Sequence, residues 1–244
     1  MIHLKTAGMS KSFGGIKAVN RLSVAFAPGK ITGLIGPNGS GKSTLINLLT
    51  GFLPCDSGFV FVGERIKLAG IRPHQAAPLG ITRTFQETRL FDQMSVLDNV
   101  LVALTERSVW RSIFDATKER HLQAARTELE RVGLWEKRLD PAAGLSYGQR
   151  KLLEVARALA LGADVYLFDE PFAGLFPSMT ETLSAILNYL RNRGKTVVLV
   201  EHDLDLIRKL SDRCVVMDAG QVLAEGTPDE VLARRDVINA YLGN

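Results

Sequence analysis

The stretch from residue 31 to residue 49 constrains the fold more than any other part of the chain. The apolar run Ile31–Ile35 predicts a strand, and a helix is indicated after residue 44 by the spacing of Leu45, Ile46, Leu48 and Leu49. Between the two lies the pattern G-x-x-x-x-G-K-S, as Gly36-Pro37-Asn38-Gly39-Ser40-Gly41-Lys42-Ser43-Thr44. A glycine-rich loop that joins a strand directly to a helix predicts an α/β fold with this loop at an edge of the sheet.

This loop has the chemistry of a phosphate-binding site. Its glycines let successive backbone N–H groups turn inward around a phosphate, and the N-terminus of the following helix adds positive potential. Lys42 supplies a point charge for the β- and γ-phosphates, and the Ser43 hydroxyl suits a hard cation such as Mg²⁺. A chance glycine-rich turn would lack the flanking strand and helix. We therefore expect nucleotide contacts from Asn38, Gly39, Ser40, Gly41, Lys42, Ser43 and Thr44.

An acidic pair, Asp169 and Glu170, follows the apolar run Val165–Phe168. A buried strand would deliver Asp169 to its carboxyl end, where open α/β sheets bind ligands and where a carboxylate can hold Mg²⁺ directly or through water. Glu170 is then the natural group to polarise an attacking water. The alternative is that the two carboxylates only cap the next helix. Acidic pairs after a strand often do this, but the phosphate loop in the same chain favours the metal and water roles.

The remaining patterns predict a β/α core interrupted by helices. Parallel strands covered on both faces are indicated at 165–168 and 196–200, joined through a helix at 179–191. Further strands are expected at Ile2–Met9, Leu22–Phe26, Phe59–Val62, and in a hairpin of Cys214–Met217 and Gln221–Ala224 with the turn Asp218-Ala219-Gly220. A block of helices is expected at roughly 90–160, with segments near 95–104, 115–132 and 146–159.

The amino-acid composition excludes several classes of protein. Apolar residues make up 46% and charged residues 23% of the 244 residues, which excludes a disordered or collagen-like chain. Only two cysteines occur, and the first residues lack the pattern of a signal peptide, so an intracellular location is expected. A net charge of +4 does not argue for a nucleic-acid track.

Leu145-Ser146-Tyr147-Gly148-Gln149 opens the last helix of this block, and here the whole chain resembles the ATP-binding cassette family. Leu-Ser-x-Gly-Gln is similar to that family's signature, in which Ser146, Gly148 and Gln149 would contact ATP held by the opposite subunit of a head-to-tail dimer. The resemblance implies a P-loop NTPase (RecA-like) α/β core with an antiparallel β subdomain and an inserted α-helical signature subdomain. It implies one domain over 1–244, with 1–88 and 163–244 as core plus β subdomain and 89–162 as the helical subdomain.

Other positions match the family pattern one by one. Gln86 resembles the loop glutamine that senses Mg²⁺ and the nucleophilic water, and His202 resembles the switch histidine on the γ-phosphate. Phe13 lies where the family places a ring against adenine, although an ordinary core phenylalanine is the alternative. The resemblance thus implies ATP and Mg²⁺ as cofactors, catalytic roles for Glu170, His202, Lys42 and Gln86, and metal contacts from Ser43, Gln86 and Asp169.

A finer resemblance, to the ATPase subunits of branched-chain amino acid importers, is carried by Gly80–Gln86, Arg89-Leu90-Phe91, Tyr147, Glu201-His202-Asp203 and the ending Glu225–Gly243. It implies a peripheral subunit at the cytoplasmic face of the inner membrane. Its partners would be two permease subunits, a second ABC ATPase (homologous or identical) and, indirectly, a periplasmic binding protein, without nucleic acid. Import of urea or short amides, lipopolysaccharide extraction and a nucleic-acid-directed cassette are the alternatives.

Two other nucleotide-binding classes are less well supported. A GTP switch would need an Asn-Lys-x-Asp motif, which the sequence lacks, and a small-molecule kinase would lack the signature pentapeptide.

Phe176 departs from the family pattern, because the loop after Glu170 usually carries Asp or Asn at this position. An aromatic ring cannot make the hydrogen bonds by which that polar residue helps to couple two nucleotide sites. We expect Phe176→Asp to change the cooperativity of ATP hydrolysis in the purified complex more than the affinity for nucleotide. Unchanged cooperativity would count against this role.

Overall fold

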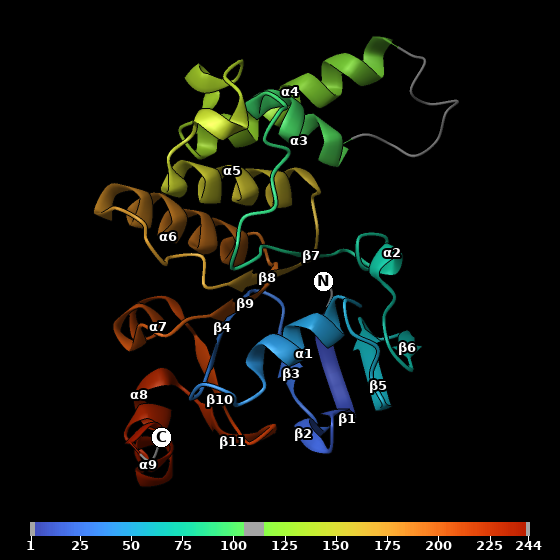
Figure 1. The fold of residues 1–244 in the computed structure, drawn as a ribbon, viewed down its shortest axis with the longest axis vertical. Helices are drawn as coiled ribbons and strands as arrows, with labels where there is room; N and C mark the ends of the chain where they lie inside the picture. Colours follow the sequence, from blue (N-terminus) through green and yellow to red (C-terminus); the bar gives the residue numbers. More distant parts are fainter. Residues whose placement is uncertain (1–2, 105–114, 243–244) are drawn as a thin grey trace. The chain divides into compact units, whose positions relative to one another are not determined.

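The computed structural model describes residues 3–104 and 115–242, and its contacts divide the chain into two compact units (Figure 1). The sheet unit comprises Met1–Arg83, Ala163–Glu170 and Leu187–Asn244. The helical unit comprises Thr84–Gly162 and Pro171–Ile186. The single domain and its subdomain limits at 88/89 and 162/163 stay predictions.

A mostly parallel sheet forms the centre of the sheet unit, in the order β11-β10-β4-β9-β8-β7. Its strands are β4 (Lys30–Ile35), β7 (Ile81–Arg83), β8 (Val165–Asp169), β9 (Thr196–Val200), β10 (Arg213–Asp218) and β11 (Gln221–Gly226), and only the β10–β11 pair among them is antiparallel. Every residue of β8 and β9 is buried. The predicted strands covered on both faces are therefore confirmed.

An antiparallel sheet forms the second layer of this unit, in the order β2-β1-β5-β6, with β3 paired to β1. Its strands are β1 (Leu4–Phe13), β2 (Ile16–Leu22), β3 (Ala25–Phe26), β5 (Ser57–Val62) and β6 (Ile66–Leu68). The sequence analysis predicted strands that match the first part of β1 and most of β5. It did not predict β6 or most of β2.

The strand predicted at Leu22–Phe26 is wrong, because the chain leaves regular pairing at residues 23 and 24. The buried hydroxyl of Thr6 takes the place of a strand partner there. Its Oγ1 donates to the carbonyl of Leu22 at 3.1 Å and accepts the N–H of Val24 at 3.0 Å. The run is therefore divided between the end of β2 and the short β3.

Helix α1 (Lys42–Leu49) lies in an apolar core that both sheets share. Its Leu45, Ile46, Leu48 and Leu49 are at most 1% exposed. They join one cluster with side chains of β1, such as Leu4 and Met9, and of the parallel sheet, such as Val198 and Val215. The apolar face of this helix is stable only when it is covered in this way.

The other helices wholly within the sheet unit are short. They are α2 (Pro73–Ala76), α7 (Leu204–Leu210), α8 (Pro228–Leu232) and α9 (Arg235–Leu242), none of which the sequence analysis specified as a helix. Asp203 caps α7 by accepting the N–H groups of Asp205 and Leu206. Each of these helices has at most eight residues, so it completes at most about two turns, and a helical period is hard to recognise in so short a segment.

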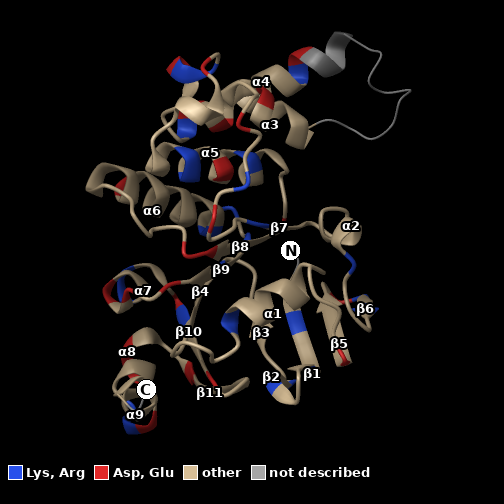
Figure 2. Ribbon diagram, in the orientation of Figure 1, with Lys and Arg blue, Asp and Glu red and all other residues tan. Residues whose placement is uncertain are grey.

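The helical unit contains the three helices that the sequence predicted between 90 and 160. They are α3 (Val96–Leu104), α4 (Asp115–Arg131) and α5 (Tyr147–Ala160), together with one-turn 3₁₀ helices at Trp135–Lys137 and Ala142–Gly144. Helix α6 (Pro177–Asn192) begins in this unit and ends in the sheet unit. Figure 2 shows both basic and acidic residues along α5, although Lys151 and Glu154 are buried.

The predicted hairpin is confirmed, with Asp218 and Gln221 paired across a two-residue turn. Both turn residues have positive φ, 44° at Ala219 and 76° at Gly220, as in the type I′ turn that suits the strand twist. Alanine is a poor residue at such a position, because its Cβ crowds the backbone.

Ala219→Asn should therefore raise the free energy of unfolding by about 1 kcal/mol, since asparagine tolerates this conformation better. Denaturant unfolding followed by circular dichroism would measure the gain. Ala219→Val, which crowds the turn further, should lower stability. Equal midpoints for the two variants would contradict this account.

Candidate functional site

The predicted phosphate loop joins β4 to α1 at the carboxyl end of the parallel sheet, as the sequence predicted. Two of its glycines are required by close backbone contacts. A Cβ on Gly36 would lie 2.1 Å from the carbonyl oxygen of Met217, and one on Gly41 would lie 2.2 Å from that of Ala18. Both glycines also have positive φ, 148° and 103°. Any side chain at either position would have to displace a neighbouring strand.

The N-terminus of α1 faces this loop without a side-chain cap. Gly41 is the N-cap residue, and glycine has no side chain that could accept the first N–H groups of the helix. These groups have no partner within a helix, and the helix dipole adds positive potential at the same end. The arrangement suits an anion such as a phosphate.

Lys42 places its ammonium group inside the loop. Nζ donates to the carbonyl oxygens of Gly36 at 2.7 Å and Pro37 at 3.0 Å, and the residue is only 6% exposed. Burial lowers the pKa of Lys42, while the charges of Glu170 and Asp169 act in the opposite direction. The carbonyls and nearby carboxylates thus compensate a cation that has lost much of its water.

Asp169 is the last residue of β8 and Glu170 follows it, so the acidic pair lies at the end of this strand as the sequence predicted. Asp169 is 5% exposed, and its Oδ2 forms an ion pair of 3.1 Å with Nη2 of Arg83. Glu170 has φ 49°, a rare value for a residue with a side chain, and its N–H donates to the carbonyl of Val200 at 3.0 Å. A strained backbone at the end of a buried strand is typical of a functional position.

His202 approaches Glu170 from the end of the neighbouring strand β9. Its Nε2 lies 2.7 Å from Oε1 of Glu170. The imidazole is half exposed, whereas the Glu170 side chain is 17% exposed. Because β8 and β9 are parallel neighbours, both side chains emerge at the same edge of the sheet.

These groups line one pocket of about 320 Å³ within the sheet unit. Its walls are formed by Ala18, Asn38, Gly39, Ser40, Gly41, Lys42, Ser43, Thr44, Glu170 and His202. The structure therefore brings together the loop, the glutamate and the histidine that the sequence proposed separately. Ala18 was not proposed; nothing in its local sequence distinguishes it.

Phe13 lies outside this lining, at the turn between β1 and β2. It is 45% exposed, pairs in register with Ile16, and lies 5.5 Å from Nζ of Lys11. The alternative that Phe13 is an ordinary core residue is therefore wrong. Its contact with adenine stays a prediction.

The proposed signature residues begin α5 in the helical unit. Ser146 is the N-cap: its Oγ accepts the N–H of Gln149 at 3.4 Å, and Oε1 of Gln149 accepts the N–H of Ser146 at 3.1 Å. A Cβ on Gly148 would lie 2.5 Å from Sδ of Met179 in α6. Gly148 is thus explained by helix packing, and the contacts of all three residues with ATP stay predictions.

The segment around Gln86 is bound to the middle of α5 within the same unit. Oε1 of Glu154 accepts the N–H of Phe85 at 3.2 Å, and the carboxylate also accepts the N–H of Arg89. Arg157, one turn further along α5, donates to the carbonyl of Arg89. Burial raises the pKa of Glu154 to about 7. Sequence reasoning missed these anchors, although a carboxylate among Leu152, Leu153, Val155 and Ala156 was a usable signal.

The oxygen atoms that this site offers as metal ligands suit a magnesium nucleotide better than a metal ion that is held by protein side chains alone. No group of three or more His, Cys, Asp or Glu side chains within residues 3–104 and 115–242 could hold a metal. A hydroxyl, Ser43, and a carboxylate, Asp169, are the type of partial donor set that Mg²⁺ completes with phosphate oxygens and water.

In the part of the chain that the structure covers, every helix is too short or too polar to cross a membrane.

Comparison with known protein families gives two matches. Residues 19–173 match the family described as ABC transporter. Residues 221–244 match a second family, described as branched-chain amino acid ATP-binding cassette transporter.

Individual relatives match nearly the whole chain. The chain is 40% identical to the high-affinity branched-chain amino acid transport ATP-binding protein LivG of Salmonella typhimurium. The match covers 98% of this chain and 97% of that protein. A crystal structure of a nucleotide-free ATP-binding cassette from an ABC transporter has a TM-score of 0.87 and 35% identity, with 100% of both chains covered. A dimeric post-hydrolysis cassette bound to ADP and Pi has a TM-score of 0.80 and 25% identity, over 92% of this chain and 98% of that one.

The raised pKa of Glu154 predicts a specific pH dependence of stability. Between about pH 4.5 and 7 the folded chain keeps a proton on this carboxyl that the unfolded chain has lost. The stabilisation from this proton is complete below about pH 4.5 and is lost as the pH rises through about 7. Glu154→Gln cannot ionise, so its stability relative to the unchanged chain should rise by about 2 kcal/mol between roughly pH 5 and 8.

Denaturant unfolding at several pH values would measure this difference. Glu130→Gln is a matched control, because Glu130 lies on α4 in the same unit with its side chain 49% exposed, paired with Arg126. Parallel pH profiles of the unchanged chain and Glu154→Gln would contradict the effect of burial.

Proposed function

Because the chain belongs to the ATP-binding cassette transporter family, we propose that it is the ATP-binding and ATP-hydrolysing subunit of an importer for branched-chain amino acids. One observation carries the catalytic part of this proposal: the phosphate loop, Glu170 and His202 line a single pocket. The cargo is supported by the match of residues 221–244 and by the relationship to LivG. The cargo itself does not touch this subunit, so the assignment concerns the transport system.

In this proposal the phosphate loop binds and orients the triphosphate. Its backbone N–H groups and those at the start of α1 surround the phosphates, with side-chain contacts from Asn38, Ser40, Ser43 and Thr44. Lys42 exchanges its bonds with the Gly36 and Pro37 carbonyls for the β- and γ-phosphates. Phe13, exposed at the β1–β2 turn, stacks on the adenine.

Glu170 acts as the general base that activates the attacking water. His202 orients the Glu170 carboxylate through the 2.7 Å contact and stabilises charge on the γ-phosphate. Ser43 and Asp169 would hold Mg²⁺, which supplies charge neutralisation on the β- and γ-phosphates when bound, and the metal contact of Gln86 stays a prediction.

Two cassettes would close around two ATP molecules. Ser146, Gly148 and Gln149 of one cassette then cover the nucleotide in the phosphate loop of the other, with the N-terminus of α5 directed at the γ-phosphate. Opening after hydrolysis would drive two permease subunits at the cytoplasmic face of the inner membrane. A periplasmic binding protein would deliver the amino acid to the permeases.

Purification from membranes tests the assembly. The proposal predicts recovery of this chain with two multispanning permeases and a second, non-identical cassette. Loss of this subunit should abolish ATP-dependent uptake of leucine, isoleucine and valine but spare urea uptake. Recovery with nucleic acid, or ATP hydrolysis that no membrane partner affects, would refute the importer assignment.

Glu170→Gln should bind ATP normally, because the amide keeps the size of the side chain, but should lower the ATP turnover rate by at least about 100-fold. The closed dimer should accumulate with ATP bound, which size-exclusion chromatography would detect. Glu181→Gln, an exposed glutamate of α6, is the matched control and should hydrolyse ATP normally. Near-normal turnover of Glu170→Gln would show that another group is the base.

A further inference from the structure

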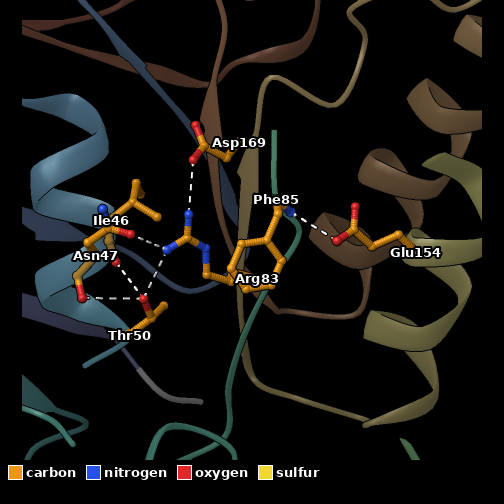
Figure 3. A network of polar contacts seen from close by, with 7 residues as sticks. All are labelled: Ile46, Asn47, Thr50, Arg83, Phe85, Glu154 and Asp169. Atoms are coloured by element: carbon orange, nitrogen blue, oxygen red, sulfur yellow. Dashed lines mark hydrogen bonds and ion pairs between the residues drawn. The ribbon is translucent and has the colours of Figure 1, made fainter. Parts of the chain in front are cut away.

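Arg83 is a buried arginine whose guanidinium group is held from several sides. It ends β7, and its side chain is 8% exposed. Nη2 contacts Oδ2 of Asp169 at 3.1 Å, while Nη1 donates to Oδ1 of Asn47 at 2.6 Å and Oγ1 of Thr50 at 3.3 Å (Figure 3). All four residues belong to the sheet unit.

The position of this guanidinium does not depend on Asp169 alone. Asn47 lies in the last turn of α1 and Thr50 is its C-cap, so the cation sits at the negative end of the helix dipole. Thr50 is itself fixed by donating to the carbonyl of Ile46 at 2.8 Å (Figure 3). The ring of Phe52 lies 5.4 Å from Cζ of Arg83, within the range of a cation–π contact. The same helix therefore carries the phosphate loop at its N-terminus and supports Arg83 at its C-terminus.

Asp169 gains both a counter-charge and a fixed orientation from this contact. Its side chain is 7% exposed, so little water is available to compensate the carboxylate. A buried carboxylate that loses its cationic partner is strongly destabilised as an anion. The planar fork of arginine can reach Asp169 with one nitrogen and Asn47 with the other, which a lysine ammonium cannot do in the same geometry.

We infer that Arg83 is a positioning residue for the metal site: it holds the carboxylate of Asp169 in place to receive the Mg²⁺ of the bound nucleotide. The inference rests on the proposed function, because it takes Asp169 as a metal-binding group. It adds a residue outside the pocket lining, joined to the pocket through Asp169 and α1. Partners of metal ligands commonly change metal affinity in this way without contacting the metal.

The test is the Mg²⁺ dependence of nucleotide binding, measured with a fluorescent ATP analogue on the purified chain in EDTA and in a Mg²⁺ titration. Arg83→Met should raise the Mg²⁺ concentration needed for half-maximal binding by about 10-fold or more. Binding in EDTA should stay within about twofold, because the phosphate loop is unchanged. Arg83→Lys keeps the charge but not the fork, and should give a smaller rise.

Arg213→Met is the matched control. Arg213 is also a strand arginine of the sheet unit paired with a carboxylate, Glu225, but its side chain is 39% exposed. Arg213→Met should leave the binding of the analogue unchanged both in EDTA and in the Mg²⁺ titration. If Arg83→Met does not fold, as judged by circular dichroism, Arg83→Lys and Asn47→Ala carry the test, since each should still raise the Mg²⁺ requirement.

The outcomes separate this inference from the proposed function. An unchanged chain that binds no analogue overturns both. If the unchanged chain binds the analogue, two results overturn the inference alone. In the first, the Arg83 variants keep the original Mg²⁺ requirement; in the second, they lose affinity for the analogue equally with and without Mg²⁺. The second result would mean that Arg83 supports only the general structure of the loop.

Discussion

The contact between the backbone of the phosphate loop and two neighbouring strands is the constraint on which the site depends. At Gly36 and Gly41 the loop approaches the carbonyls of Met217 and Ala18 too closely to admit a Cβ. The N–H of Gly220 also donates to the carbonyl of Ser40 at 3.0 Å. The loop is thus shaped by β10, β2 and the β10–β11 turn. This packing fixes the backbone of the loop that carries Lys42, so the position of its ammonium group is set by the fold.

The charges of Lys42 and Asp169 lie where water is scarce, and the fold compensates both of them. Carbonyl oxygens surround Lys42, Arg83 pairs with Asp169, and His202 contacts Glu170. The strained φ of Glu170 is maintained by a hydrogen bond to the adjacent strand β9. The apolar core around α1 supports this arrangement, because it holds both ends of the helix against the sheets.

Much of the fold and of the pocket could be predicted because the signals are local. Continuous apolar runs identified β8 and β9, and the strand–loop–helix pattern identified the phosphate loop. The prediction of one strand over Leu22–Phe26 was wrong, because the side chain that interrupts pairing there, Thr6, comes from another strand. Short elements such as β7 have too few residues to show a period.

The sequence by itself determined which groups this protein can bring to a phosphate: glycines that permit the loop, a lysine, a hydroxyl and carboxylates at a strand end. Only the tertiary structure decided how those groups are held. The contact of His202 with Glu170, the support of Asp169 by Arg83 and the anchoring of Phe85 by Glu154 each join residues far apart in the chain. Residue type and spacing report the local backbone, whereas such pairings depend on which strands and helices become neighbours when the core forms.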